Sequence, residues 1–346
     1  IRIHGFASLQ PVTGLLADRW SRKWIMVISN FVQMGLALCF LMVDGPEDIW
    51  WLITLSGVMM ILHGAYMTAE RAALPNIVEK HELATANALD AATWSTALAT
   101  RAFLGGLVVA EYGVNTAFVI DSITFLVGAL ILIPLTVPQH VSKDMQGPIF
   151  STAFSNIKAG FVRVINEPRL KRIVFAKTTW NLAGGGLAGV FLVIAGTQMT
   201  PGEMASGIGL FFMARGIGTG IGPIIARKYL VNKSRWPALV GILVSVSGFF
   251  YLLIGLTIFE NLYLTIFLIV LAHSASGANW VLSTILTQQW VEDEMRGRVF
   301  SIDMLLMSIS FSTSTYVAGW LRDNSEMTLQ QGMVWFSCAM MAFGII

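Results

Sequence analysis

The chain has 346 residues, of which 55% are hydrophobic and only 12% are charged, and its mean hydropathy is +0.69. A chain with 21 Phe, 17 Met and 11 Trp beside 22 basic and 20 acidic side chains cannot cover a water-facing surface, so a cytosolic enzyme and a nucleic-acid-binding protein are both excluded. The formal net charge of +2 indicates no partner until the basic residues are placed in loops.

Runs of about 20 apolar residues, the length that crosses a ~30 Å hydrocarbon core, predict an all-α polytopic membrane protein. A shortened run at 3–17 comes first, and ten full runs follow at 24–43, 48–69, 88–110, 114–134, 173–198, 205–226, 237–258, 262–286, 299–320 and 330–346. The chain begins at Ile1 and stops inside an apolar run, so we expect a missing first helix and a truncated last one.

One long polar interruption, residues 135–172, divides these runs. The sequence therefore predicts an N-terminal helical half at 1–134 with five visible spans and a C-terminal half at 173–346 with six. Between them we expect a central loop. Within this loop Phe150, Phe154, Ile157, Phe161 and Ile165 recur at helical spacing, which predicts an amphipathic helix on the membrane lipids, as a passive tether or as a mobile linker.

Basic residues are concentrated in alternate connectors, which predicts that these connectors are cytoplasmic. They are Arg19, Arg22, Lys23, Arg71, Lys80, Lys143, Lys158, Arg163, Arg169, Lys171, Arg172, Arg227, Lys228, Lys233, Arg235, Arg296 and Arg298. The opposite connectors hold one basic residue, Arg322. We therefore expect a multi-pass protein of a bacterial plasma membrane whose central loop is cytoplasmic.

Internal repetition indicates that the two halves are duplicates. The segment from Gly14 to Arg19 recurs at Gly222 to Arg227, a shift of 208 residues, and the pair Gly64-Ala65 recurs at Gly277-Ala278, a shift of 213. Duplicated helical halves around a site near the bilayer midplane are typical of alternating-access transporters.

Gly14-x-x-x-Asp18-Arg19-x-Ser21-Arg22-Lys23 resembles the loop motif G-x-x-x-D-R-x-G-R-K of the major facilitator superfamily, with Ser21 in place of the second glycine. Three further segments, 70–89, 118–126 and 290–302, are similar to the branch of macrolide-efflux proteins and the enterobactin exporter. The resemblance implies two six-helix halves and a secondary transporter that works as an efflux antiporter. We expect it to act as a monomer.

The loop motif has a physical interpretation of its own. Asp18 ends one span where it can lie at the N-terminus of another helix, such as the one starting near Val299, or pair with Arg71. Such a contact would latch the two halves together. Gly14 permits close helix approach, and Arg19, Arg22 and Lys23 either anchor the chain at the anionic leaflet or take part in gating.

Ionisable groups inside the spans are candidate coupling or substrate sites, because each is costly unless paired or exposed to a wet cavity. Arg101 and Asp121 lie at similar depth on consecutive spans and are predicted to pair, as a structural salt bridge or as a proton-dependent switch. No carboxylate lies at a matching depth in the second half to pair with Arg215. This arginine either attracts an anionic group in the cavity or bonds to helix carbonyls or water.

His63 and His273 lie on repeat-equivalent spans, where each either couples to protons or hydrogen-bonds between helices. Asn181 and Asn279 are polar contacts between helices or part of a cavity lining. Six glycines at 207–222 predict close packing of one span against the other half, or bending of this span during transport.

The sequence contains no phosphate-binding loop and no metal-ligand spacing, so we expect no cofactor, no metal and no ATP-driven transport. The favoured function is secondary active efflux of a small amphiphilic molecule, a drug or a siderophore, coupled to protons or sodium. The alternatives are a membrane-embedded enzyme such as a polytopic acyltransferase, with His81 near Glu79 and Glu82, and a non-transporting sensor or fragment.

Overall fold

The computed structural model describes residues 20–79, 82–137, 149–200, 204–229, 235–257 and 261–345, and all regular structure in these ranges is helical. The predicted all-α class is confirmed. Seven of the described helical segments are long and apolar enough to cross a membrane. The expected span at 299–320 is also helical, but its many Ser and Thr residues keep it out of these seven. The run at 3–17 lies outside the described residues.

The N-terminal helix group, α2 to α4, consists of α2 (Arg22–Cys39), α3 (Ile49–Ile77) and α4 (Leu83–Leu132). The helical stretch assigned to α4 is interrupted at Gly113, whose φ of +81° is in the region that favours glycine. The predicted spans 88–110 and 114–134 lie on either side of this break. The second arm packs on α2, where the Ser122 hydroxyl donates to the Met34 carbonyl over 3.1 Å.

The C-terminal helix group, α6 to α12, begins with α6 (Pro168–Gly186), whose proline is at the first turn, where no N–H is needed. A π-helical turn (Leu187–Phe191) connects it to α7 (Leu192–Met199). The other members are α8 (Met204–Tyr229), α9 (Trp236–Thr257), α10 (Leu262–Trp290), α11 (Asp293–Asn324) and α12 (Leu329–Ile345). The Asn261 side chain caps α10 by accepting hydrogen bonds from the N–H groups of Tyr263 and Leu264.

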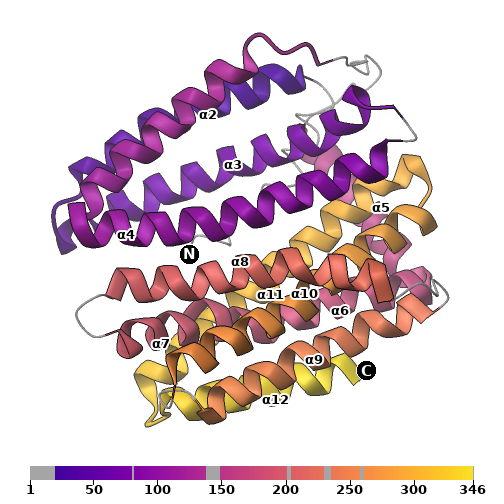
Figure 1. The fold of residues 1–346 in the computed structure, drawn as a ribbon. Helices are drawn as coiled ribbons and strands as arrows, with labels where there is room; N and C mark the ends of the chain where they lie inside the picture. Colours follow the sequence, from indigo (N-terminus) through magenta and orange to yellow (C-terminus); the bar gives the residue numbers. More distant parts are fainter. Residues whose placement is uncertain are drawn as a thin grey trace.

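The two helix groups lie side by side, and α4 contacts α8 across the boundary (Figure 1). The core of the C-terminal group is formed by fully buried side chains such as Leu187, Phe211 and Tyr251. Its glycines allow the closest helix contacts: a Cβ on Gly222 would lie 1.9 Å from the Ser274 carbonyl oxygen, and one on Gly218 would lie 2.4 Å from the Val270 oxygen. These glycines therefore pack α8 on α10 of the same group, not on the other half as expected.

Helix α5 (Ile149–Asn166) contains the residues of the expected amphipathic helix, and one of its faces is docked on α11. Ile157 packs on the cluster that includes fully buried Val164, while Gly160 brings the helix backbone against the Arg298 carbonyl. Phe154 and Phe161 are exposed. The expectation of a helix that only lies on lipid is therefore incomplete, because the Ile157 and Val164 face is committed to the protein.

An ion pair joins α5 to the start of α11. The Arg163 guanidinium contacts Glu167, which lies between α5 and α6, and donates to the Glu292 carboxylate over 3.0 Å. The backbone N–H of Glu292 itself, and then Arg163, lower the pKa of the Glu292 carboxyl below its usual value. Because its pKa is lowered, the Glu292 carboxylate stabilises the docked state at pH values above the usual pKa of a glutamate. This stabilisation is lost as the pH falls through the lowered pKa.

We expect acidification to loosen α5 from α11. At neutral pH the α5 amides should exchange more slowly in the wild type than in Glu292→Gln. As the pH falls, exchange in the wild type should approach that in the variant, because only the wild type has an ion pair to lose. Comparing the two proteins at each pH removes the intrinsic pH dependence of exchange. Equal protection of wild type and variant at neutral pH would show that the ion pair does not hold α5.

Candidate functional site

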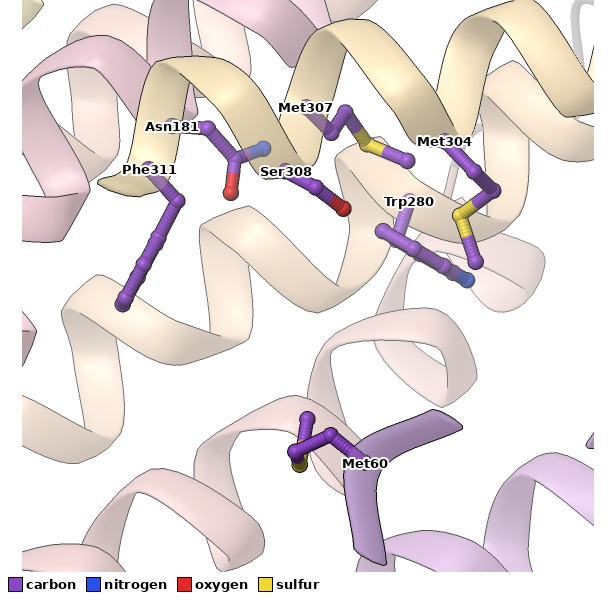
Figure 2. A pocket seen from close by; sticks show the side chains of 7 residues that line it. All are labelled: Met60, Asn181, Trp280, Met304, Met307, Ser308 and Phe311. Atoms are coloured by element: carbon purple, nitrogen blue, oxygen red, sulfur yellow. The ribbon is translucent and has the colours of Figure 1, made fainter. Parts of the chain in front are cut away.

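A cavity of about 260 Å³ lies between the two helix groups. One wall is Met60 from α3 of the N-terminal group, and Figure 2 shows it across an open space from the other labelled side chains. The opposite wall comes from α6, α10 and α11, with the residues Asn181, Trp280, Met304, Met307, Ser308 and Phe311. A site that needs both groups is the arrangement that alternating access requires.

The cavity lining is mainly apolar. Met304, Met307, Ser308 and Phe311 follow at helical spacing and therefore share one face of α11. Methionine and aromatic side chains adapt to apolar ligands of varied shape. The Asn181 amide and the Ser308 hydroxyl supply hydrogen-bonding groups, although the Asn181 Nδ2 already donates to the Lys177 carbonyl over 2.8 Å. This lining suits an amphiphilic molecule.

A buried ion pair lies behind the cavity wall. The Lys177 ammonium of α6 contacts the Asp303 carboxylate of α11, and the two side chains are 3% and 2% exposed. Lys177 Nζ also lies 5.7 Å from the centre of the Trp280 ring, within the range of a cation–π contact. Oδ1 of Asp303 is buried and has no hydrogen-bond partner among the described residues. The pair thus connects α6, α10 and α11, which form one cavity wall.

Sequence patterns alone did not indicate this pair. Lys177 stands near the cytoplasmic end of its predicted span, close to Lys171 and Arg172, and resembles an anchoring residue of that cluster. Asp303 lies equally near the start of the span 299–320. Their similar depth on two spans was the available signal. Asp303 is thus a buried carboxylate of the C-terminal half, and it pairs with Lys177 and not with Arg215.

His273 lies in the core of the C-terminal group. It is 2% exposed, and its Nε2 is 2.7 Å from the Tyr251 hydroxyl of α9. Its Nδ1 lies 3.3 Å from the Ser276 hydroxyl, and its ring meets Trp180 edge to face. This is the geometry of the interhelical hydrogen bond, one of the two alternatives for this residue.

Arg215 of α8 lies near the same cluster and acts electrostatically on Tyr251 and His273. Its guanidinium carbon is 4.7 Å from the centre of the Phe212 ring. The Arg215 Nε is buried without a hydrogen-bond partner among the described residues. None of these contacts places Arg215 in the lining of the cavity with Met60.

Arg101 and Asp121 lie on the two arms of α4, one on each side of Gly113. Both side chains are exposed, and the charge of Arg101 acts electrostatically on Asp121. The salt bridges found within the described ranges do not include this pair. Their direct pairing stays a prediction.

The remaining predicted residues are dispersed. Asn181 lines the cavity. Asn279 directly precedes the cavity residue Trp280 in sequence, but its side chain is only 3% exposed. Its Oδ1 has no hydrogen-bond partner among the described residues. His63 is exposed on α3, one turn from Met60. No cluster of His, Cys, Asp or Glu suited to a metal ion occurs within the described part of the chain.

The loop motif is described in part. Gly14, Asp18 and Arg19 lie outside the described residues, as does the side chain of Arg71 on α3. Arg22 and Lys23 begin α2, and Lys23 Nζ is 5.5 Å from the centre of the Trp24 ring. The latch remains a prediction.

The sequence matches the model of the Major Facilitator Superfamily over residues 3–202. The chain belongs to the major facilitator superfamily. Membership confirms the predicted superfamily and the class of integral membrane transporter, as distinct from an enzyme. The cavity between the helix groups is thus part of a small-molecule transporter.

Relatives within this superfamily are distant. The uncharacterised transporter YfiS of Bacillus subtilis (strain 168) is 25% identical over 84% of this chain and 69% of its own length. A proposed bacilysin exporter, BacE of the same strain, is 24% identical over 85% of this chain and 71% of its own length. The uncharacterised transporter Rv0037c of Mycobacterium tuberculosis is 23% identical over 91% of this chain and 73% of its own length.

Proposed function

We propose that this transporter exports a small amphiphilic molecule of the drug or siderophore type by alternating access, driven by a proton gradient. The observation that carries the proposal is the cavity between Met60 of one helix group and the Trp280, Asn181 and Ser308 wall of the other. It combines apolar surface with two hydrogen-bonding side chains. The relative BacE is itself a proposed exporter, which supports the direction of transport.

The two halves of the transporter are those that the sequence predicts. Residues 1–134 and 173–346 act as the two halves, and residues 135–172 connect them on the cytoplasmic side of a bacterial inner membrane. The monomer is the working unit. The sequence similarity of 70–89, 118–126 and 290–302 to macrolide-efflux proteins and the enterobactin exporter supports a place in that branch.

The roles of the predicted site residues belong to the same proposal. Asp18, Gly14 and Arg71 contribute to closing the cytoplasmic side, and Arg19, Arg22 and Lys23 either anchor the chain at the anionic leaflet or take part in this closure. Arg101, Asp121, Arg215, His63, His273, Asn181 and Asn279 are candidates for coupling or for substrate contact. Of these, Asn181 lines the cavity, so it is the most direct candidate for hydrogen bonding to the substrate.

Proton coupling predicts a defined energetic signature. A membrane potential of 100 mV provides about 2.3 kcal/mol per charge, so one proton per substrate sustains roughly a 40-fold concentration difference. In proteoliposomes with an imposed proton gradient, the protein should accumulate erythromycin or a catechol siderophore. When a protonophore is added, the concentration difference of the probe across the membrane should disappear. Accumulation should continue without ATP.

Two outcomes would contradict this proposal. Accumulation that persists with protonophore but disappears without sodium would replace the proton by sodium. Failure to accumulate any amphiphilic probe, while a small polar solute does accumulate, would show that the substrate class is wrong. Liposomes without protein provide the baseline for passive entry of each probe.

A further inference from the structure

We propose that Asp303 is the proton-binding carboxylate of this transporter, and that Lys177 is the internal cation that the proton displaces. The inference rests on the proposed function, because it names the residues that couple the proton to the cavity. It differs from the candidates that the sequence indicates, since neither residue is among them.

The first support is the cost of the arrangement. Taking two opposite charges out of water is repaid only when good geometry satisfies their remaining hydrogen-bonding capacity. Asp303 meets this condition at one oxygen, which contacts Lys177, while its Oδ1 is buried without a partner among the described residues. An ionisable pair kept inside a membrane span at such cost indicates a functional site.

The second support is the connection to the cavity. Asp303 directly precedes Met304, and Met307 follows one turn later on α11. Lys177 lies one turn before Asn181 on α6 and beside the Trp280 ring of α10. A change in the ion pair therefore reaches the cavity lining through three helices without passing through any other charged group.

The third support is the electrostatic isolation of the pair. Among the described side chains, Lys177 is the charged group that acts on Asp303. On neighbouring helices, Arg163 of α5 is engaged by Glu167 and Glu292, and His273 of α10 is bonded to Tyr251 of α9. The described residues of α12 carry no charged side chain, and Arg298 of α11 is exposed.

The chemical step is a single proton transfer. A proton from water binds a carboxylate oxygen of Asp303 and forms the neutral acid, and the Lys177 ammonium loses its counter-ion. The net charge of the site changes from zero to +1. An uncompensated buried ammonium is unfavourable, so Lys177 turns toward the polar groups of the cavity and the α6–α11 contact weakens. Release of the proton restores the pair.

The test uses the purified full chain and needs no substrate. In infrared difference spectra recorded between mildly acidic and mildly alkaline pH, the wild type should show a buried carboxylic acid band that is absent from the double variant Lys177→Gln/Asp303→Asn. The double variant removes both charges, so it is expected to fold where Asp303→Asn alone leaves Lys177 unpaired. The control, Arg163→Gln/Glu292→Gln, removes an exposed ion pair and should keep the band.

Transport provides a second readout, with erythromycin as the probe in proteoliposomes. The double variant should exchange erythromycin across the membrane but lose the roughly 40-fold accumulation that one proton sustains at 100 mV. The proposal would be overturned if the double variant kept the infrared band. It would also be overturned if the double variant still accumulated erythromycin in full dependence on the proton gradient. A wild type that shows the Asp303 band but does not respond to protonophore would support Asp303 as a proton site and refute proton-driven export, so the two failures are distinguishable.

Discussion

Replacing Asp303 by leucine alone is expected to destabilise the protein by about 3–5 kcal/mol, the usual cost of breaking a buried ion pair. The physical reason is that the Lys177 ammonium, 3% exposed, is left without a counter-ion in an apolar surrounding. The measurement is the thermal unfolding of purified protein in detergent, followed by the loss of the monodisperse peak on gel filtration.

Replacing both members of the pair should cost far less. In Lys177→Met/Asp303→Leu no charge remains to be desolvated, and side chains of similar volume fill the space, an exchange that is often neutral or stabilising. We therefore expect the double variant to recover most of the stability that Asp303→Leu loses. Additive losses in the single and double variants would show that the two residues act independently.

A single methyl group on Gly222 is expected to have the second large effect. The Cβ of Gly222→Ala would lie 1.9 Å from the Ser274 oxygen and 2.9 Å from the Ser274 Cα, both backbone atoms of α10. Backbone cannot move aside as a flexible side chain does, so α8 and α10 must separate. Overpacking of this kind typically costs about 1–3 kcal/mol, which exceeds the gain of up to about 1 kcal/mol from replacing a helical glycine by alanine.

Gly57 is the matched control because a Cβ there meets nothing within 4 Å. Gly57→Ala on α3 should therefore leave stability unchanged or raise it by up to about 1 kcal/mol through helix propensity. The same unfolding assay should therefore give stability changes of opposite sign for Gly222→Ala and Gly57→Ala. A neutral Gly222→Ala would show that α8 and α10 are further apart than their packing indicates.

Much of the fold could be predicted from local sequence. The helices coincide with the apolar runs because a membrane span must satisfy its own backbone hydrogen bonds, and this requirement is local. The break at Gly113 and the cap at Asn261 follow from residue type in the same way. The spacing of Phe154 to Ile165 indicated a helix, but not that the Ile157 and Val164 face packs on α11.

The candidate site was predicted less well, because its residues come from separate helices. Asn181 was indicated as polar and lines the cavity, whereas Met60 and Trp280 looked like any other apolar residue of a span. For His273 the sequence left open proton coupling or a hydrogen bond between helices, and the structure places it beside Tyr251 in the core. Period and composition indicate which residues share a helix face, but not which neighbour that face meets.

The sequence by itself determined that this protein is a helical membrane transporter of the major facilitator superfamily, because length, hydropathy and a loop motif are properties of contiguous residues. Only the tertiary structure decided which polar groups are partners: Lys177 with Asp303, Tyr251 with His273, and Arg163 with Glu292. Each of these contacts joins two helices. Their formation depends on the rotation and depth of both helices together, which packing between side chains sets and no single segment encodes.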